Sequence, residues 1–411
     1  MEKKKTNMSI LLILLCWLIY ACSYMGKVNY AANINQIMSF YNVDHSSAGL
    51  VSTFFFFAYG IGQVLNGLFC KKYNLKWIIF SSLALSGSIN LIVGITHNFE
   101  LIKILWLLNG LSMSVLWPSL IRLLSENLDR EVMPKASMII GTTIATGTFL
   151  IYLLSALFVK IDFKLSFYLP AGIFFVVAFI WLFSYSSLIS KVKAEEEEKP
   201  EVAREEAEKR EGYNKRLILL TICTLALYGI ATNLIKDGLT TWVPSILKEQ
   251  YNLDGSISIV LTLALPIVSI FANAFAIKLH NKISDFVLQC SITFLCAGLI
   301  IGAVIAGISL NQFILTLLGF TIVCFLVSSC NSVITSIFPL FMKGKVNSGL
   351  IAGVLNGFCY LGSTLSSYGL GSIADNWGWI AVFWTLLFVC AAVCLCAGIY
   401  LLISKKKAIK E

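Results

Sequence analysis

The chain has 411 residues, of which 58% are hydrophobic and only 13% are charged, and its formal net charge is +9. Soluble domains carry close to a quarter charged residues, so this composition excludes an ordinary soluble protein. The apolar residues occur in runs of about 18 or more, long enough to cross a bilayer as a helix. The basic excess therefore belongs to loops beside a membrane rather than to a nucleic-acid-binding surface.

The apolar runs predict an all-α membrane protein with twelve spans, because each run is continuous, whereas the strands of a closed barrel alternate over about 10 residues. The first run is interpreted as a retained span and not as a signal peptide, since it exceeds an apolar region of about 7–15 residues. The predicted spans cover residues 9–35, 45–70, 76–96, 100–125, 134–159, 164–189, 216–246, 255–280, 285–307, 310–341, 347–373 and 379–403.

Lysine and arginine residues gather in one set of the predicted loops. This set contains Lys3, Lys4, Lys5, Lys71, Lys72, Lys76, Arg130, Lys135, Lys278, Lys282, Lys343, Lys345, Lys405, Lys406 and Lys407. The opposite loops are short and hold Lys103, Lys160, Lys164 and Lys248. By the positive-inside rule, both termini are predicted to be cytoplasmic, in a protein of the inner membrane.

One long hydrophilic segment, residues 191–215, interrupts the apolar pattern. Its mixed charge and lack of an apolar face predict a solvated cytoplasmic linker. The segment divides the chain into a half of six spans at 1–190 and a second half of six spans at 216–411.

The twelve cysteines lie mostly inside predicted spans and form no C-x-x-C pair, so they are interpreted as small apolar residues. No metal site, cofactor or disulfide is predicted. The sequence also contains no catalytic dyad or nucleotide-binding loop, and we expect no enzymatic activity.

The two predicted halves share a local pattern. A lysine inside the first span, Lys27, is followed by "YNVD" at 41–44, and Lys236 in the seventh span is followed by "YNLD" at 251–254. Asp44 and Asp254 are each predicted to cap the next helix. A cap signature can arise locally, but its similar offset from an intramembrane lysine favours a true internal repeat.

Five further stretches carry motifs of a known family. They are "KVNYA" (27–31), "AYGIGQVLNG" (58–67), "WPSLIR" (117–122), "IKDGLTTWVPSILKE" (235–249) and "AGVLNGFCYLGSTLSSYGLGSIADNWGW" (352–379). Through them the chain resembles the organophosphate:phosphate antiporters of the major facilitator superfamily, which include glycerol-3-phosphate and hexose-phosphate transporters. The resemblance implies a major facilitator fold and a substrate site between the halves, near the middle of the membrane.

The chain departs from that family at several motif positions. Lys27 and Lys236 stand where the family has two phosphate-binding arginines, and each keeps the positive charge without the bidentate fork. Gln63 replaces a lysine, Ile144 replaces a histidine, and Lys71 occupies a loop position where an aspartate is expected. The first-helix and fourth-helix motifs also resemble the anion:cation symporters, in some of which the arginine corresponding to Arg122 binds substrate.

Charged residues inside the spans are few, and such residues are costly in a bilayer. The candidates are Lys27, Arg122, Lys236 and Asp237. Lys27 and Lys236 are predicted to contact substrate from opposite halves, and Asp237 to balance charge or carry a proton. Lys236 and Asp237 are not expected to pair, because adjacent helical residues point about 100° apart.

Arg122 lies near the cytoplasmic end of its helix, where a structural partner or a gate is favoured over substrate contact. The further candidate substrate-binding residues, all donors, are Gln63, Tyr59, Tyr24 and Tyr30.

The two intramembrane lysines predict transport of a small organic anion. The resemblance to the antiporters implies a secondary active transporter for a sugar or polyol phosphate, which works by alternating access in exchange for phosphate. Two alternatives stay open: a proton- or sodium-coupled symporter of organic carboxylates, and a transporter-like sensor of sugar phosphate. The expected partners are a small anion and the lipid bilayer, with no nucleic acid, and the protein is expected to be a monomer.

Overall fold

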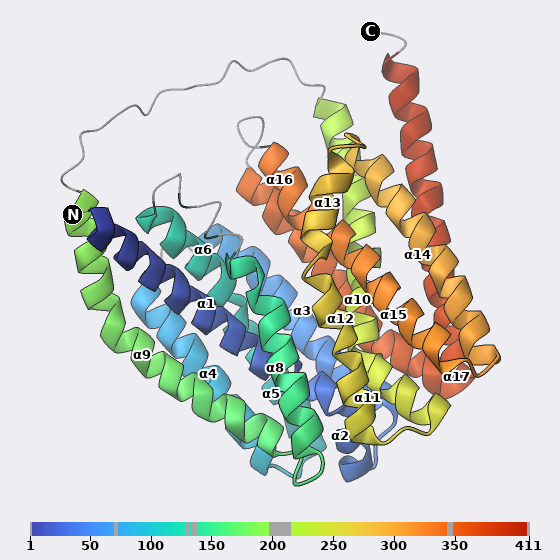
Figure 1. The fold of residues 1–411 in the computed structure, drawn as a ribbon, viewed down its shortest axis with the longest axis horizontal. Helices are drawn as coiled ribbons and strands as arrows, with labels where there is room; N and C mark the ends of the chain where they lie inside the picture. The colour runs from blue at the N-terminus through green and yellow to red at the C-terminus, as the bar shows by residue number, and fades with distance from the viewer. Residues whose placement is uncertain are drawn as a thin grey trace.

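The computed structural model describes residues 2–69, 73–128, 132, 136, 139–196, 215–342 and 348–408, and every regular element among them is helical. The first helix group comprises α1 (Glu2–Ala32), α2 (Ile34–Tyr41), α3 (His45–Phe69), α4 (Leu75–Ile95), α5 (Phe99–Ser114), α6 (Leu116–Asn127), α8 (Thr143–Phe158) and α9 (Leu165–Glu196). The second group comprises α10 (Lys215–Tyr251), α11 (Gly255–Thr262), α12 (Ala264–Ser269), α13 (Ala272–His280), α14 (Phe286–Ser309), α15 (Phe313–Ser332), η2 (Val333–Ile337), α16 (Phe338–Phe341) and α17 (Ser348–Ala408). The two groups lie side by side (Figure 1).

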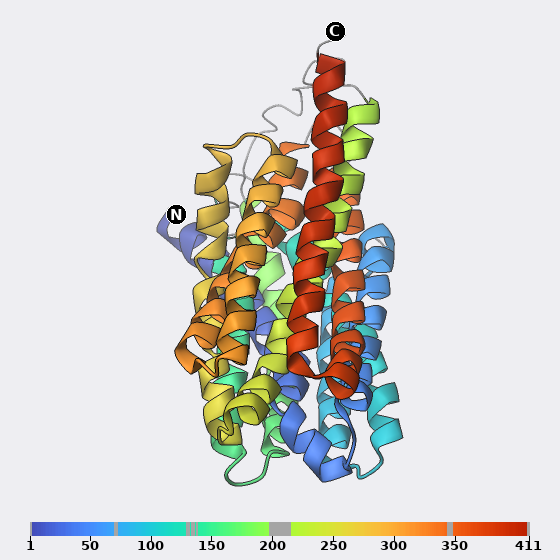
Figure 2. The same cartoon turned by 90° about the vertical axis from the view of Figure 1, so that its right-hand side faces the viewer.

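The predicted all-α membrane fold is confirmed. Eleven helical segments among the described residues are long and apolar enough to cross a membrane. The eleventh of these contains two predicted spans, because α17 turns back at Gly378, whose φ of 76° and ψ of 173° are not helical. Figure 2 shows the two arms of α17 side by side, joined by this turn. The break falls between the predicted spans 347–373 and 379–403.

The two Tyr-Asn-x-Asp motifs have the same local structure. Asn42 and Asn252 both adopt left-handed conformations, with φ of 53° and 50°. The carboxylates of Asp44 and Asp254 then accept hydrogen bonds from the backbone N–H groups of Ser47 and Ser256, at 2.8 Å in each case. Both predicted caps are confirmed, and each motif ends one helix and starts the next.

Five prolines lie inside the described spans, and each lacks the N–H that would bond the carbonyl four residues earlier. At three of them, Pro118, Pro170 and Pro244, a side-chain donor pairs the released carbonyl. Pro118 releases the carbonyl of Ser114, which accepts a hydrogen bond from Gln63 Nε2 at 3.1 Å. Pro170 releases Ser166, whose oxygen accepts from Asn29 Nδ2 at 3.0 Å.

The third proline joins the two helix groups. Pro244 in α10 releases the carbonyl of Thr240, which accepts the hydroxyl hydrogen of Tyr152 in α8 at 2.8 Å. Tyr152 is fully buried, so this bond is made without competition from solvent. Side chains of neighbouring helices therefore supply the donors that these prolines remove.

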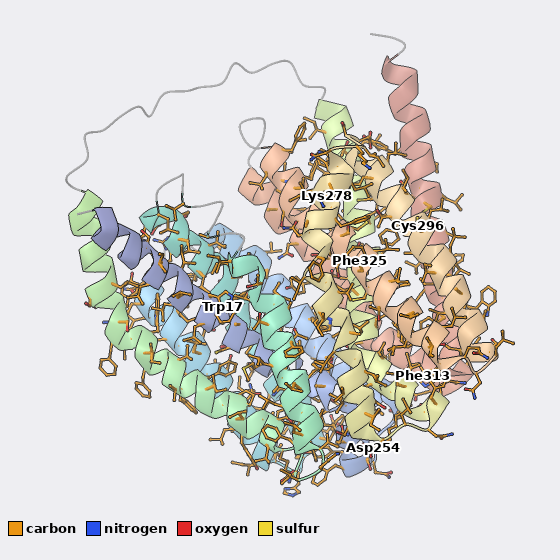
Figure 3. All side chains as sticks on the ribbon, in the orientation of Figure 1. Trp17, Asp254, Lys278, Cys296, Phe313 and Phe325 are labelled. Atoms are coloured by element: carbon orange, nitrogen blue, oxygen red, sulfur yellow. The ribbon has the colours of Figure 1, made fainter. Side chains whose placement is uncertain are left out.

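The start of α1, the end of α17 and the helix ends that flank residues 197–214 lie at one end of the molecule (Figure 1). Lys278 is at this end, and Asp254 is at the opposite one (Figure 3). The basic loop residues Lys71, Lys72, Arg130, Lys135, Lys343 and Lys345, and most of the predicted linker, lie outside the described residues.

Tyr152→Phe removes only the hydroxyl that pairs with the Thr240 carbonyl. We expect the variant to lose about 1–3 kcal/mol of stability, since a buried acceptor is left unsatisfied. In a Pro244→Ala background the carbonyl regains a backbone N–H partner, so the same substitution should cost clearly less. Thermal unfolding of the four purified proteins measures this coupling. Tyr368→Phe, at an exposed tyrosine, is the control, and equal losses in both backgrounds would contradict the interpretation.

Candidate functional site

Lys27 lies among aromatic rings contributed by both helix groups. Tyr20, Tyr24 and Lys27 are four and three residues apart, which puts them on one face of α1. The Lys27 Nζ atom is 4.1 Å from the ring centroid of Tyr59 in α3, 4.9 Å from that of Tyr24 and 5.1 Å from that of Tyr360 in α17. It also donates a hydrogen bond to the Tyr360 hydroxyl, at 3.5 Å.

The ammonium group of Lys27 has no carboxylate partner within salt-bridge distance among the described residues. Its neighbours are aromatic faces, which attract a cation without neutralising it. Two phenylalanine rings, of Phe55 and Phe56, are centred 5.8 and 5.9 Å from Nζ. A half-buried cation in such surroundings is suited to an incoming anion.

Lys236 has a partner within its own helix. Its Nζ atom is 3.5 Å from Oδ1 of Asp237, so the expectation that these two residues do not pair is wrong. The long, flexible lysine side chain can bend toward its neighbour, which an argument from Cβ directions alone overlooks. Ser363 of α17 also fixes the carboxylate, because its hydroxyl donates to Oδ2 of Asp237.

A polar chain extends from this ion pair into the second helix group. Asn233, one turn before Asp237 in α10, donates to the Ser363 hydroxyl at 3.1 Å. Asn331 of α15 donates in turn to Asn233, at 2.8 Å. The chain ties the position of Asp237 to three helices, so the ion pair is held in place by more than its own charges.

The two lysines approach the same stretch of α17. Tyr360 contacts Lys27, and Ser363, one turn later, contacts the partner of Lys236. Lys27 is also within electrostatic reach of both Lys236 and Asp237. An anion near Tyr360 and Ser363 can therefore interact with both cations.

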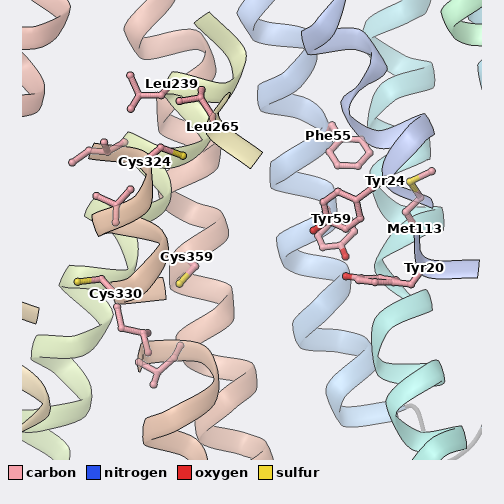
Figure 4. Packing of buried hydrophobic residues seen from close by; sticks show 14 of the residues in the cluster. Tyr20, Tyr24, Phe55, Tyr59, Met113, Leu239, Leu265, Cys324, Cys330 and Cys359 are labelled. Carbon is pink, nitrogen blue, oxygen red and sulfur yellow. The ribbon is translucent and has the colours of Figure 1, made fainter. Parts of the chain in front are cut away.

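Tyr24, Tyr59 and Gln63 belong to the same region of the first group. Figure 4 shows Tyr20, Tyr24 and Tyr59 close together between the helices. The rings of Tyr59 and Tyr360 are 4.7 Å apart, across the boundary between the groups. Gln63, one turn after Tyr59, donates to the Ser114 carbonyl and accepts from Asn356 of α17 at 3.3 Å, so both ends of its amide are engaged.

Two candidate residues lie away from Lys27. The hydroxyl of Tyr30 donates to the Ala48 carbonyl at 3.0 Å, and its ring packs on Trp106. The guanidinium of Arg122 binds Glu126 at 2.6 Å and the carbonyl of Tyr73 at 3.0 Å. These contacts hold Arg122 to its own helix and to the residues before α4, and they match the structural role favoured for it.

Several residues near the lysines were not among the sequence candidates. They are Tyr20, Asn233, Asn331, Tyr360 and Ser363. The position of Asn233 could have been inferred from the sequence, because it lies four residues before Asp237 and therefore on the same face of the helix. Tyr360 and Ser363 lie in the 352–379 stretch, which carries a family motif. This stretch also packs closely against α10, because a Cβ at Gly362 would collide with the backbone of Ile230.

No group of three histidine, cysteine, aspartate or glutamate residues that could hold a metal occurs among the described residues. A cavity of about 250 Å³ lies between α8 and the α12 region, lined by Ala145, Thr146, Phe149, Ile267 and Ile270. None of its lining residues is charged, so the cavity is separate from the lysines.

The sequence is similar to named transport and sensor proteins. It is 21% identical over 402 residues to a "Probable hexose phosphate transport protein" of Chlamydia trachomatis, a match that covers 92% of this chain and 87% of the relative. It is 26% identical over 99 residues to the "Membrane sensor protein UhpC" of Escherichia coli K12. That second match covers only 24% of this chain and 23% of the sensor.

The fold is similar to that of a solved transporter structure. A bacterial homolog of the human lysosomal transporter Spinster, in an inward-facing and unoccupied conformation, superposes with a TM-score of 0.75 at 12% identity, and the match covers 97% of both chains. The sequence pattern of the Major Facilitator Superfamily matches residues 16–367. With its helical architecture and its resemblance to organophosphate:phosphate antiporters, the chain belongs to the Major Facilitator Superfamily.

Proposed function

We propose that the protein is a secondary active transporter that exchanges a sugar or polyol phosphate for inorganic phosphate. The observation that carries the proposal is the environment of Lys27, a half-buried cation surrounded by aromatic rings and without a carboxylate partner among the described residues. An anion supplies the missing charge. The names of the hexose phosphate transport relatives support a phosphorylated sugar as that anion.

In this mechanism the anion bridges Lys27 and Lys236. It binds first where Lys27 already presents an unneutralised charge. It then competes with Asp237 for Lys236, whose ion pair is long at 3.5 Å. Because Tyr360 and Ser363 are on one helix, occupation of the site changes the contacts of α17 with both groups. The anion also offsets repulsion between the two lysines, which favours closure around it.

Transport then follows from alternating access of two six-helix halves, residues 1–190 and 216–411, joined by the segment 191–215. We place both termini and this segment in the cytoplasm and the chain, as a monomer, in the inner membrane. Support comes from the shared position of the start of α1, the end of α17 and Lys278 at one end of the molecule (Figures 1 and 3).

A second candidate function, a sugar-phosphate sensor, is favoured by the partial similarity to UhpC. A sensor binds the ligand but does not move it, so flux measurements separate the two functions. The carboxylate symporter has weaker support, since Arg122 is engaged by Glu126 and the Tyr73 carbonyl.

Lys27→Gln and Lys236→Gln should each reduce phosphate-driven counterflow of a sugar phosphate by more than tenfold in proteoliposomes. The reason is that each removes one of the two charges that hold the anion, and a hydrogen bond to a charged group contributes about 1.5–3 kcal/mol. Initial rates of uptake of labelled glucose 6-phosphate and glycerol 3-phosphate measure the effect.

Lys103→Gln is the matched control, because Lys103 pairs with Glu100 outside the site. Its rate should remain near that of the unmodified protein. Normal counterflow by either site variant would rule out the two-lysine mechanism. Binding without any flux in the unmodified protein would favour the sensor.

Asp237→Asn tests the charge-balancing role of Asp237. Without the carboxylate, Lys236 no longer has to leave an ion pair, so the anion should bind several-fold more tightly in a calorimetric titration. Ser363 can still donate to the amide oxygen, which keeps the local structure. If Asp237 carries a proton instead, the variant will bind the anion unchanged and lose any dependence of uptake on a pH gradient.

A further inference from the structure

A histidine joins the two helix groups at the end of the molecule remote from the termini. His45 begins α3 in the first group. Its Nδ1 atom is 2.7 Å from Oδ1 of Asp375 in α17, and its Nε2 atom is 2.8 Å from Oε1 of Glu249 in α10. Trp379 donates to the other oxygen of Glu249, at 2.9 Å. We call His45, Glu249, Asp375 and Trp379 the His45 cluster.

The geometry defines the charge of the imidazole ring. Both ring nitrogens face carboxylate oxygens at hydrogen-bond distance. A neutral imidazole has one N–H and one acceptor nitrogen, so it can satisfy only one of these contacts. With both carboxylates ionised, as these groups ordinarily are near neutral pH, the arrangement requires the imidazolium form, with a proton on each nitrogen.

Asp375 makes a second connection between the groups. Its carboxylate oxygens accept the backbone N–H groups of His45 at 3.2 Å and of Ser46 at 2.7 Å. These are unpaired donors of the first turn of α3, where a negative charge is favourable. A residue of the second group thus completes the N-terminus of a helix in the first.

Close packing surrounds the cluster on the side of the protein interior. The His45 ring lies 5.5 Å from the ring of Trp242 and 5.2 Å from that of Trp379. A Cβ at Gly371 would collide with the His45 carbonyl, so α3 and α17 are in backbone contact here. Separating the groups at this end requires all these contacts to break together.

The cluster nevertheless remains accessible to protons. The side chains of His45, Glu249 and Asp375 are 19%, 38% and 20% exposed. In the described part of the chain, the charged groups that contact the ring are these two carboxylates. Lys248 adjoins Glu249, and the Asp44 carboxylate is bonded to Ser47.

We propose that His45 is a proton-binding site that keeps this end of the transporter closed when protonated and lets it open when the proton leaves. The closed state needs the imidazolium, whereas an open state, with the carboxylates withdrawn, does not. The state that binds more protons is favoured at low pH. Closure is therefore strongest below the titration of imidazole, at about pH 6.5 for an unperturbed ring, and weakens above it. The proton exchanges with the solvent at this end of the protein.

The test measures the distance between spin labels across this end, with no substrate present. Labels at Ile161 and Leu310, both exposed in loops of opposite groups, report opening in a cysteine-free background of the full chain in nanodiscs. We expect one short distance at about pH 5.5, where a free imidazole is charged, and a severalfold rise of a longer-distance population at about pH 8.5.

Two variants identify the group responsible. His45→Gln should show the longer distance at both pH values, and Asp375→Asn, which can still accept the N–H groups of α3, should show a reduced pH response. His97→Gln, at a second histidine that contacts Phe40 and not the cluster, should behave like the unmodified protein. Monodisperse elution of each variant shows that it is folded.

The proposal is overturned if the unmodified protein gives the same distances at both pH values, or if His45→Gln and Asp375→Asn both keep the full response. The measurement uses no sugar phosphate, so it stands or fails separately from the proposed substrate. Counterflow at varied pH on the His45 side then tells whether the same proton limits transport.

Discussion

Hydrocarbon offers no hydrogen-bond partner, so every backbone carbonyl that a proline releases inside a span must be paired by the protein itself. At Pro118, Pro170 and Pro244 the donors are Gln63, Asn29 and Tyr152. Each of these bonds connects two different helices. At each of these prolines, a carbonyl that would bond within its own helix instead accepts a hydrogen bond from a side chain of a neighbouring helix. These bonds hold the paired helices together.

This constraint also bears on the candidate site. Gln63 is held by the carbonyl that Pro118 releases, and its other end meets Asn356 of α17. Tyr59, one helical turn before Gln63, is held in place with it, and its ring contacts that of Tyr360. The two lysines differ in how their charge is accommodated: Lys27 has aromatic faces, whereas Lys236 has Asp237. The two Tyr-Asn-x-Asp turns have the same local structure, but the surroundings of the two lysines differ in charge. Among the described residues, Lys236 has a carboxylate partner and Lys27 has none.

The features that could be predicted from the sequence are those that depend on local chemistry. Span positions follow from the length of apolar runs, and the caps at Asp44 and Asp254 follow from their motif. The pairing of Lys236 with Asp237 could not be predicted, since it depends on the bend of a long side chain and on Ser363, more than a hundred residues away. The His45 cluster was equally hidden, because its members come from three helices that adjoin only after folding. A contact between the two helix groups does not change the spacing of apolar residues in either helix, so the sequence pattern does not reveal it.

The first arm of α17 carries both Tyr360 and Asp375 without a break, since its non-helical residue is Gly378. Fifteen residues of helix span roughly 22 Å at about 1.5 Å per residue. This unbroken helix therefore connects the region of the lysines to the His45 cluster, and a tilt at one of its ends moves the other. If the arm tilts by about 10° around Tyr360, Asp375 moves by roughly 4 Å. A shift of this size separates hydrogen-bonded atoms beyond bonding distance. A small rotation near Tyr360 thus becomes a larger displacement at Asp375, and loss of the His45 contacts needs no change in the helix itself.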